Sequence, residues 1–124
     1  NVAMPLRLQG SSAAESARVA GDLLIEIGLA ERLDHFPDQM SGGERQRVAV
    51  ARAVSANPSI LLADEPTGNL DFDSAVQVMT MLTDLARSKS IALLVVTHDQ
   101  AMLSRFDRVY ELANGTLSEK RVER

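Results

Sequence analysis

The sequence predicts an α/β fold in which a helical first part precedes a unit of two parallel strands. Two short apolar runs, residues 60–63 and 91–96, are typical of strands that are buried on both faces of a sheet. Between them, apolar residues recur at helical spacing over residues 73–87. A strand, a helix and a second strand in this order predict parallel strands that are joined by a right-handed crossover.

A capping box marks the first long helix. Ser12 and Glu15 have the S-x-x-E spacing in which each side chain bonds to the other residue's backbone N–H. Apolar residues then recur at helical spacing, and Gly28 is expected to end the helix because glycine readily adopts the positive φ of a helix C-terminus. We therefore expect a helix over residues 11–27.

A polar connector, residues 29–39, leads to a second capped helix. Pro37 is expected to end any short turn of helix inside the connector. Ser41 and Glu44 repeat the capping-box spacing. They open a helix that should continue to about residue 56, where an Asn-Pro pair breaks it.

These signals divide the chain into a helical part, residues 1–58, and an α/β part, residues 59–124. After the second apolar run, residues 99–105 are expected to be helical. The dipeptide Asn114-Gly115 is typical of a two-residue hairpin turn, so we expect a short strand on each side of it. With 124 residues, the chain can build one small core.

The composition excludes several classes of protein. There are 13 Lys and Arg against 17 Asp and Glu, a net charge of −4, which argues against a general affinity for nucleic acid or anionic lipid. The absence of cysteine excludes disulfides, zinc–thiolate sites and cysteine nucleophiles. The apolar runs are far shorter than the roughly 20 residues of a membrane-spanning helix.

Polar residues follow both predicted strands at the sheet edge where open α/β sheets bind ligands. Asp64 and Glu65 should point to opposite faces, so Asp64 could hold Mg²⁺ while Glu65 orients or deprotonates an attacking water. His98 follows the second strand, and parallel pairing would bring it beside these acids. The alternative is a solvated strand edge with two acids and a structural histidine.

The start of the second long helix has the properties of an anion site. Ser41, Gly42 and Gly43 combine a hydroxyl, exposed backbone N–H groups and the positive end of a helix dipole. Glycine costs about 1 kcal/mol relative to alanine in a helix, a cost that close approach of a ligand to the backbone would justify. A well-capped helix with a flexible start is the alternative.

Together, these segments resemble the motifs of the ATP-binding cassette (ABC) ATPases, in the same order. Segments at both ends of the chain also resemble the lipoprotein-releasing (LolD-type) branch and its macrolide-exporter (MacB-type) and FtsE-type relatives. The resemblance implies part of a P-loop NTPase-like nucleotide-binding domain, made of the helical subdomain and the parallel-sheet C-terminal half. The motifs are the signature (MSGGERQR, 40–47), the Walker B strand with its acid (ILLADE, 60–65), the D-loop (GNLD, 68–71) and the switch histidine (VTHD, 96–99).

The resemblance implies an ATP site that two subunits share in a head-to-tail dimer. Ser41, Gly42, Gly43 and Glu44 would contact the ATP that is held by the facing subunit. Asp71 would couple the two sites across the interface.

The resemblance also implies the roles of the residues at the strand ends. Asp64 would hold Mg²⁺, Glu65 would position and activate the water, and His98 would donate to the γ-phosphate. The implied protein is an ATPase that docks on integral membrane transporter subunits at the cytoplasmic face of the bacterial inner membrane and powers lipoprotein release. Alternatives are another ABC transport system, a soluble ABC ATPase that works on DNA or ribosomes, or a non-catalytic interaction fragment.

One motif of the family does not occur in the sequence. G-x-x-x-x-G-K-[ST] is absent, because neither Lys89 nor Lys120 follows a glycine. We therefore expect the chain to be the back half of a cassette. We also expect that it neither binds MgATP tightly nor hydrolyses it alone, and that nucleic acid is not a partner.

Overall fold

The computed structural model describes residues 1–121, so the last three residues of the predicted α/β part lie outside it. The elements were expected from the sequence in this order, with the exception of the short α1 and η2. The helices are α1 (Met4–Leu8), α2 (Ala13–Glu26), α3 (Gly42–Ser55) and α4 (Phe72–Ser88), with short 3-10 segments η1 (Ala30–Arg32), η2 (Pro37–Gln39) and η3 (Gln100–Arg105). The strands are β1 (Ile60–Asp64), β2 (Ala92–Val96), β3 (Val109–Ala113) and β4 (Thr116–Lys120).

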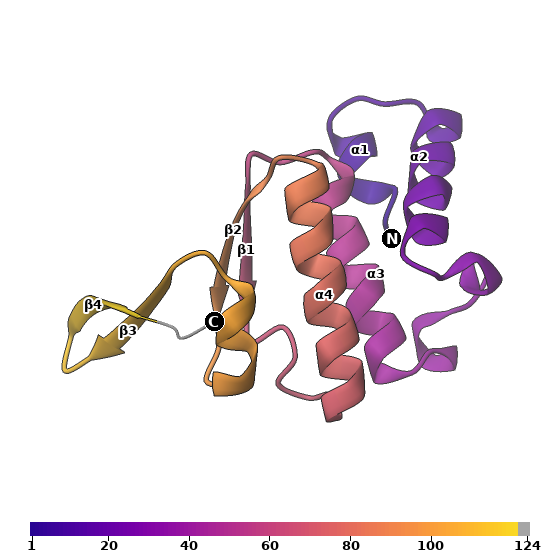
Figure 1. Ribbon diagram of the computed structural model, residues 1–124. Coiled ribbons are helices and arrows are strands. Elements are labelled where there is room, and N and C mark those ends of the chain that lie inside the picture. Colours follow the sequence, from indigo (N-terminus) through magenta and orange to yellow (C-terminus); the bar gives the residue numbers. More distant parts are fainter. Residues whose placement is uncertain (122–124) are drawn as a thin grey trace.

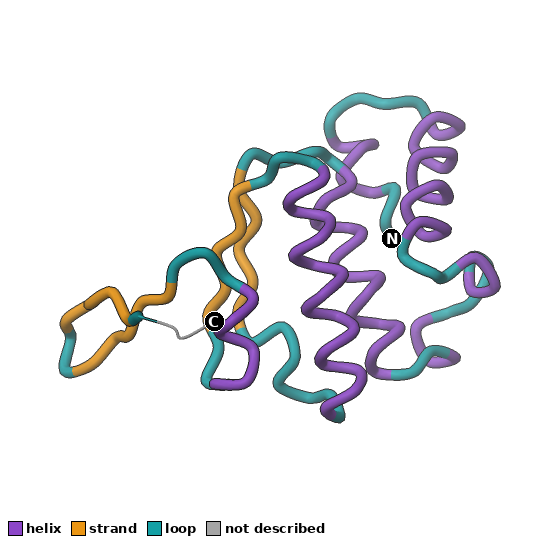
Figure 2. Tube along the Cα trace, viewed as in Figure 1, coloured by secondary structure: helices purple, strands orange, loops and turns teal. Residues whose placement is uncertain are grey.

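The elements form layers with α3 between α2 and α4 (Figure 1). Helix α4 joins β1 to β2 and lies beside β2. The two strands are parallel, in a register that runs from Ile60 opposite Ala92 to Asp64 opposite Val96. The predicted strand–helix–strand unit is therefore confirmed. The antiparallel hairpin β3–β4 projects away from the helices (Figure 2).

Helix ends follow the caps that the sequence predicts, with one difference. At α3, Ser41 Oγ accepts from the backbone N–H of Glu44 and the Glu44 carboxylate accepts from that of Ser41, so the capping box is complete. At α2, Ser12 caps Glu15, but the Glu15 carboxylate bonds instead to Arg18. This capping box is therefore only half made, because a nearby guanidinium offers the carboxylate a charged partner.

The connector differs from the prediction at Pro37. This residue begins η2 rather than ending a turn of helix, and the preceding turn is the separate segment η1. Proline suits the first position of a helical turn because the N–H that it lacks would have no partner there. Gly28, with φ +77°, ends α2 as expected.

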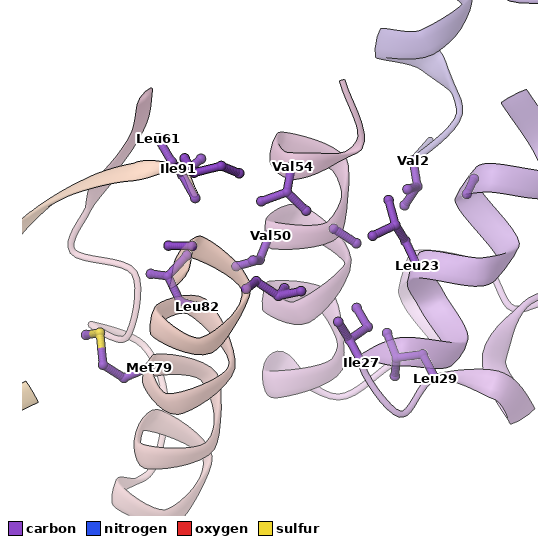
Figure 3. Packing of buried hydrophobic residues seen from close by; sticks show 14 of the residues in the cluster. Val2, Leu23, Ile27, Leu29, Val50, Val54, Leu61, Met79, Leu82 and Ile91 are labelled. Atoms are coloured by element: carbon purple, nitrogen blue, oxygen red, sulfur yellow. The ribbon is translucent and has the colours of Figure 1, made fainter. Parts of the chain in front are cut away.

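Helix α3 is packed on two sides (Figure 3). Val50 and Val54 are buried along it, between Leu23 of α2 on one side and Leu82 of α4 on the other. One hydrophobic cluster thus joins the helices to the strands, and α3 is fixed relative to both.

The two-strand sheet is buried on one face only, so the prediction of strands buried on both faces is wrong. Leu61 is 7% exposed and belongs to the core, whereas its neighbour Leu62 is 71% exposed. Ile60, Leu94 and Val96 share the open face with Leu62. An unbroken apolar run shows that both faces can be buried, but not that each face has something to cover it.

Candidate functional site

The segments that carry the predicted site residues lie at one end of the molecule (Figure 1). The carboxyl ends of β1 and β2 lie there together with the first turns of α3 and α4. The two helix starts are in contact, because a Cβ added to Gly42 would lie 3.4 Å from Leu70 Cδ2 and one added to Gly43 would lie 3.5 Å from Ser74 Oγ. The fold therefore brings the predicted anion site and the polar strand ends to the same edge.

Glu65 leaves β1 with a left-handed backbone conformation, φ +44°. This conformation is unfavourable for a residue with a Cβ, and it occurs most often where a site requires it. Two hydrogen bonds hold it: the Glu65 N–H donates to Val96 O at 2.8 Å, and its carbonyl accepts from the Gly68 N–H at 3.1 Å. The turn thus aims the carboxylate at the end of β2.

The Glu65 carboxylate is bound by residues that follow β2. Oε1 accepts from the His98 backbone N–H at 3.1 Å and lies 2.8 Å from His98 Nδ1, while Thr97 Oγ1 donates to Oε2 at 3.4 Å. The His98 ring is 83% exposed and the Glu65 side chain 38% exposed. Both groups are thus open to a ligand that enters from solvent.

Each member of this pair stabilises the charged form of the other. The hydrogen bond from His98 holds the pKa of the Glu65 carboxyl below its ordinary value. The hydrogen bond to Glu65, with that residue's negative charge, raises the pKa of His98 above its ordinary value of 6.5. Glu65 is consequently ionised near neutral pH.

The pair borders an open hollow of about 370 Å³. Its other walls come from the turn after β1 and from the residues that follow Thr97. The lining residues are Glu65, Thr67, Gly68, Leu70, Thr97, His98, Asp99 and Gln100.

Asp64 lies outside this hollow. This was expected, because neighbouring residues in a strand point to opposite faces of the sheet. It lines a separate hollow of about 200 Å³ that is bordered by α3. Its carboxylate is exposed and makes no hydrogen bond or ion pair with any residue in the part of the chain that the structure describes. Within residues 1–121 no three His, Cys, Asp or Glu side chains are grouped to hold a metal. One free carboxylate fits Mg²⁺, which takes most of its ligands from phosphates and water.

The start of α3 offers unpaired donors. Ser41 Oγ accepts a hydrogen bond from the Glu44 N–H at 3.2 Å. The N–H groups of Gly42 and Gly43, in contrast, have no acceptor among residues 1–121. They point out of the first turn, where the helix dipole favours a negative charge. The geometry therefore suits an anion that approaches from outside the chain.

Asp71 caps α4 beside this site. Its Oδ1 accepts from the Ser74 N–H at 3.0 Å and its Oδ2 from Ser74 Oγ at 2.7 Å. These bonds, the backbone one above all, lower the pKa of Asp71.

A family profile described as "ABC transporter" matches residues 6–68, just over half of the chain. The chain belongs to the ABC transporter family. The lipoprotein-releasing system ATP-binding protein LolD of Colwellia psychrerythraea is 45% identical over 117 residues, which are 94% of this chain and 45% of that protein. YbbA of Escherichia coli, an uncharacterized ABC transporter ATP-binding protein, is 48% identical over 120 residues, 97% of this chain and 53% of that protein. The chain spans about half the length of these relatives.

Solved ABC structures share the fold. The bacterial ABC transporter cassette MJ0796, in a dimeric structure, matches with a TM-score of 0.77 and 36% identity over 98% of this chain and 56% of that one. A second dimeric structure of MJ0796, in a post-hydrolysis state with ADP and Pi, matches with a TM-score of 0.77 and 35% identity. The α/β fold of an ABC cassette, predicted from the sequence, is thus confirmed.

Two further contacts of the candidate site residues did not follow from the sequence. Thr97 binds the Glu65 carboxylate, and Arg32 binds the Glu44 carboxylate. Thr97 could have been found, because it stands between the second strand and His98. Nothing in the sequence pattern connects Arg32 with Glu44, which is 12 residues away in another element.

None of the helices in the described part is both long and apolar enough to cross a membrane.

Proposed function

We propose that this chain is part of the ATP-binding subunit of an ABC transporter and contributes to an ATP-hydrolysing site. The observation that carries the proposal is the Glu65 carboxylate, held by Thr97 and His98 beside an open hollow. A charged carboxylate with an adjacent donor suits the orientation of a water for attack on a phosphoryl group. Membership of the ABC family supports ATP as the source of that group.

The start of α3 would serve the ATP of a second subunit in a head-to-tail dimer. The unpaired N–H groups of Gly42 and Gly43, with Ser41 and Asp71 beside them, would lie against the facing subunit's nucleotide. Glu44 is predicted from the sequence to be one of the residues at this nucleotide. It would contribute by holding the Ser41 N–H with its carboxylate. The dimeric structures of MJ0796 support a second subunit as partner.

Asp64, Glu65 and His98 would divide the work at the strand ends. Asp64 would be the protein ligand of Mg²⁺, which when bound would neutralise phosphate charge. Glu65 would orient the water and take its proton. His98 would donate to the phosphate oxygen on which charge develops.

Release of lipoproteins from the inner membrane is the transport process that we favour. The support for this proposal is the 45% identity with a lipoprotein-releasing LolD. The proposal implies that the protein docks on integral membrane subunits at the cytoplasmic face of that membrane. A second candidate is another ABC system, because the uncharacterized YbbA is 48% identical. The division into a helical part, 1–58, and an α/β part, 59–124, belongs to the same proposal.

A hybrid cassette tests the proposed activity. Residues 1–124 replace the matched part of MJ0796, and ATP hydrolysis is measured with Glu65→Gln as the variant. The hybrid should hydrolyse ATP, and Glu65→Gln should lower the rate by about 100-fold or more while ATP still binds. The 124-residue chain alone should be inactive.

Circular dichroism of each hybrid establishes that it is folded, and Asp73→Asn is a matched control on an exposed acid outside the site. A folded hybrid that hydrolyses ATP equally well with Gln at position 65 would remove Glu65 from the reaction. Hydrolysis by the 124-residue chain alone would show that the chain holds a complete site.

A further inference from the structure

An arginine outside the ABC motifs is connected to the start of α3 through one carboxylate. Arg32 lies in η1, and its Nε donates to Glu44 Oε1 at 3.0 Å. The other oxygen, Glu44 Oε2, accepts from the Ser41 N–H at 2.9 Å. Glu44 therefore joins the connector to the residue that opens the anion site.

The burial of this carboxylate separates it from the surface ion pairs. The Glu44 side chain is 19% exposed and that of Arg32 is 40% exposed. Arg18 on α2, which pairs with Glu15 and Asp22, is 62% exposed. Contacts that are shielded from water are stronger and hold a fixed geometry better than exposed pairs do.

Both oxygens of Glu44 have donors, so its orientation is determined. The bond from Ser41 and then that from Arg32 hold the pKa of Glu44 below its ordinary value, and the carboxylate stays charged. If Arg32 were absent, Glu44 could rotate toward water and release the Ser41 N–H. The direction of the Gly42 and Gly43 N–H groups depends on the same first turn of α3.

We propose that Arg32 is a positioning residue for the anion site at Ser41, Gly42 and Gly43. It acts through Glu44 and does not touch the anion. The proposal rests on the proposed function in one respect, which is that the anion is a phosphate group of ATP.

The test uses the full 124-residue chain and compares Arg32→Ala with Arg32→Lys by NMR. Lysine can replace the single Arg32 Nε contact with one charged donor, so it should restore what alanine removes. Two quantities are measured, the hydrogen-exchange protection of the Ser41 N–H and the pKa of Glu44. Arg18→Ala is the matched control, since it removes an arginine that forms exposed ion pairs only within α2.

In Arg32→Ala, we expect the protection of Ser41 to fall about fivefold, the factor that corresponds to the loss of one helix cap. The pKa of Glu44 should rise toward its ordinary value. Arg32→Lys should recover most of both effects, and Arg18→Ala should change neither. Unchanged Ser41 protection and Glu44 pKa in a folded Arg32→Ala chain would overturn the proposal.

A titration with MgATP at millimolar concentration separates this proposal from the proposed function. The Gly42 and Gly43 N–H resonances should shift, and the concentration for half the shift should rise about fivefold in Arg32→Ala. An equal response in Arg32→Ala and the original chain would also overturn the role of Arg32. Absence of any shift in the original chain would count against ATP as the anion, and the Ser41 protection would still decide whether Arg32 positions the turn.

Discussion

At the scale of single residues, Glu65 and His98 form a pair whose charges depend on pH in opposite ways. The pKa of His98 is raised, so its contribution to stability is fully present below pH 6.5 and is lost as the pH rises through the raised value. The pKa of Glu65 is lowered, so its contribution is present above its ordinary value and is lost as the pH falls through the lowered one. Both side chains are therefore charged between the lowered pKa of Glu65 and the raised pKa of His98.

Replacing Glu65 by Gln should lower the pKa of His98 toward 6.5, because the charge and the hydrogen bond that raise it are weakened. An NMR titration of the His98 ring measures this directly. The resonance of His35, which lies in the connector, serves as an internal reference that should not respond to the substitution. A pKa of His98 that is the same in both proteins would mean that the two side chains are not paired in solution.

The residues that carry charge at the strand ends could be identified from the sequence. Asp64 and Glu65 follow one apolar run directly, and His98 follows the other after Thr97. Parallel pairing places such residues at one edge of the sheet. Their partners could not all be identified in this way. The bond between Arg32 and Glu44 depends on where the connector lies over α3, which only tertiary packing determines.

At the scale of elements, the first turns of α3 and α4 are both capped and in contact. Asp71 caps α4 with a backbone and a side-chain bond to Ser74. Capping rules predicted the start of α3 correctly, because Ser41 and Glu44 form the complete capping box there. At α2, the same rule predicted a reciprocal bond that Arg18 takes from Glu15, because local motifs do not account for competing partners.

Asp71→Ala should destabilise the chain by about 1 kcal/mol, the usual cost of losing a helix cap. Asp71→Asn should cost only a few tenths of that, because asparagine caps as well as aspartate does. Urea unfolding of the two variants measures the difference. Asp73→Ala, in the same turn but without a capping bond, is the control for charge near the helix dipole. Equal losses for Asn and Ala at position 71 would show that the charge, not the cap, is what stabilises α4.

At the scale of the whole molecule, the two-strand sheet has one covered face and one open face. Leu61 and Leu62 are neighbours in β1 but lie 7% and 71% exposed. The sequence could not predict this difference, because both residues belong to one apolar run and burial depends on what lies against each face.

This asymmetry gives adjacent leucines different effects on stability. Leu61→Ala should cost about 2–4 kcal/mol, as large-to-small changes in a core do. Leu62→Ala should cost less than about 0.5 kcal/mol, as exposed changes do. Thermal and urea unfolding of the 124-residue chain measure both. A large cost at Leu62 would show that something covers the open face in solution, such as a second copy of the chain.

The central claim is that the start of α3 serves the ATP of a facing subunit while Glu65 acts at a separate site. The most direct test mixes two hybrid cassettes, one with Glu65→Gln and one with Gly42→Asp, whose added charge repels phosphate. Each alone should be inactive. In a head-to-tail dimer, the mixed pair has one site with both changes and one site with neither, so a 1:1 mixture should recover about a quarter of the original ATP hydrolysis. A mixture that stays inactive, although the two hybrids form dimers with each other, would contradict the shared site.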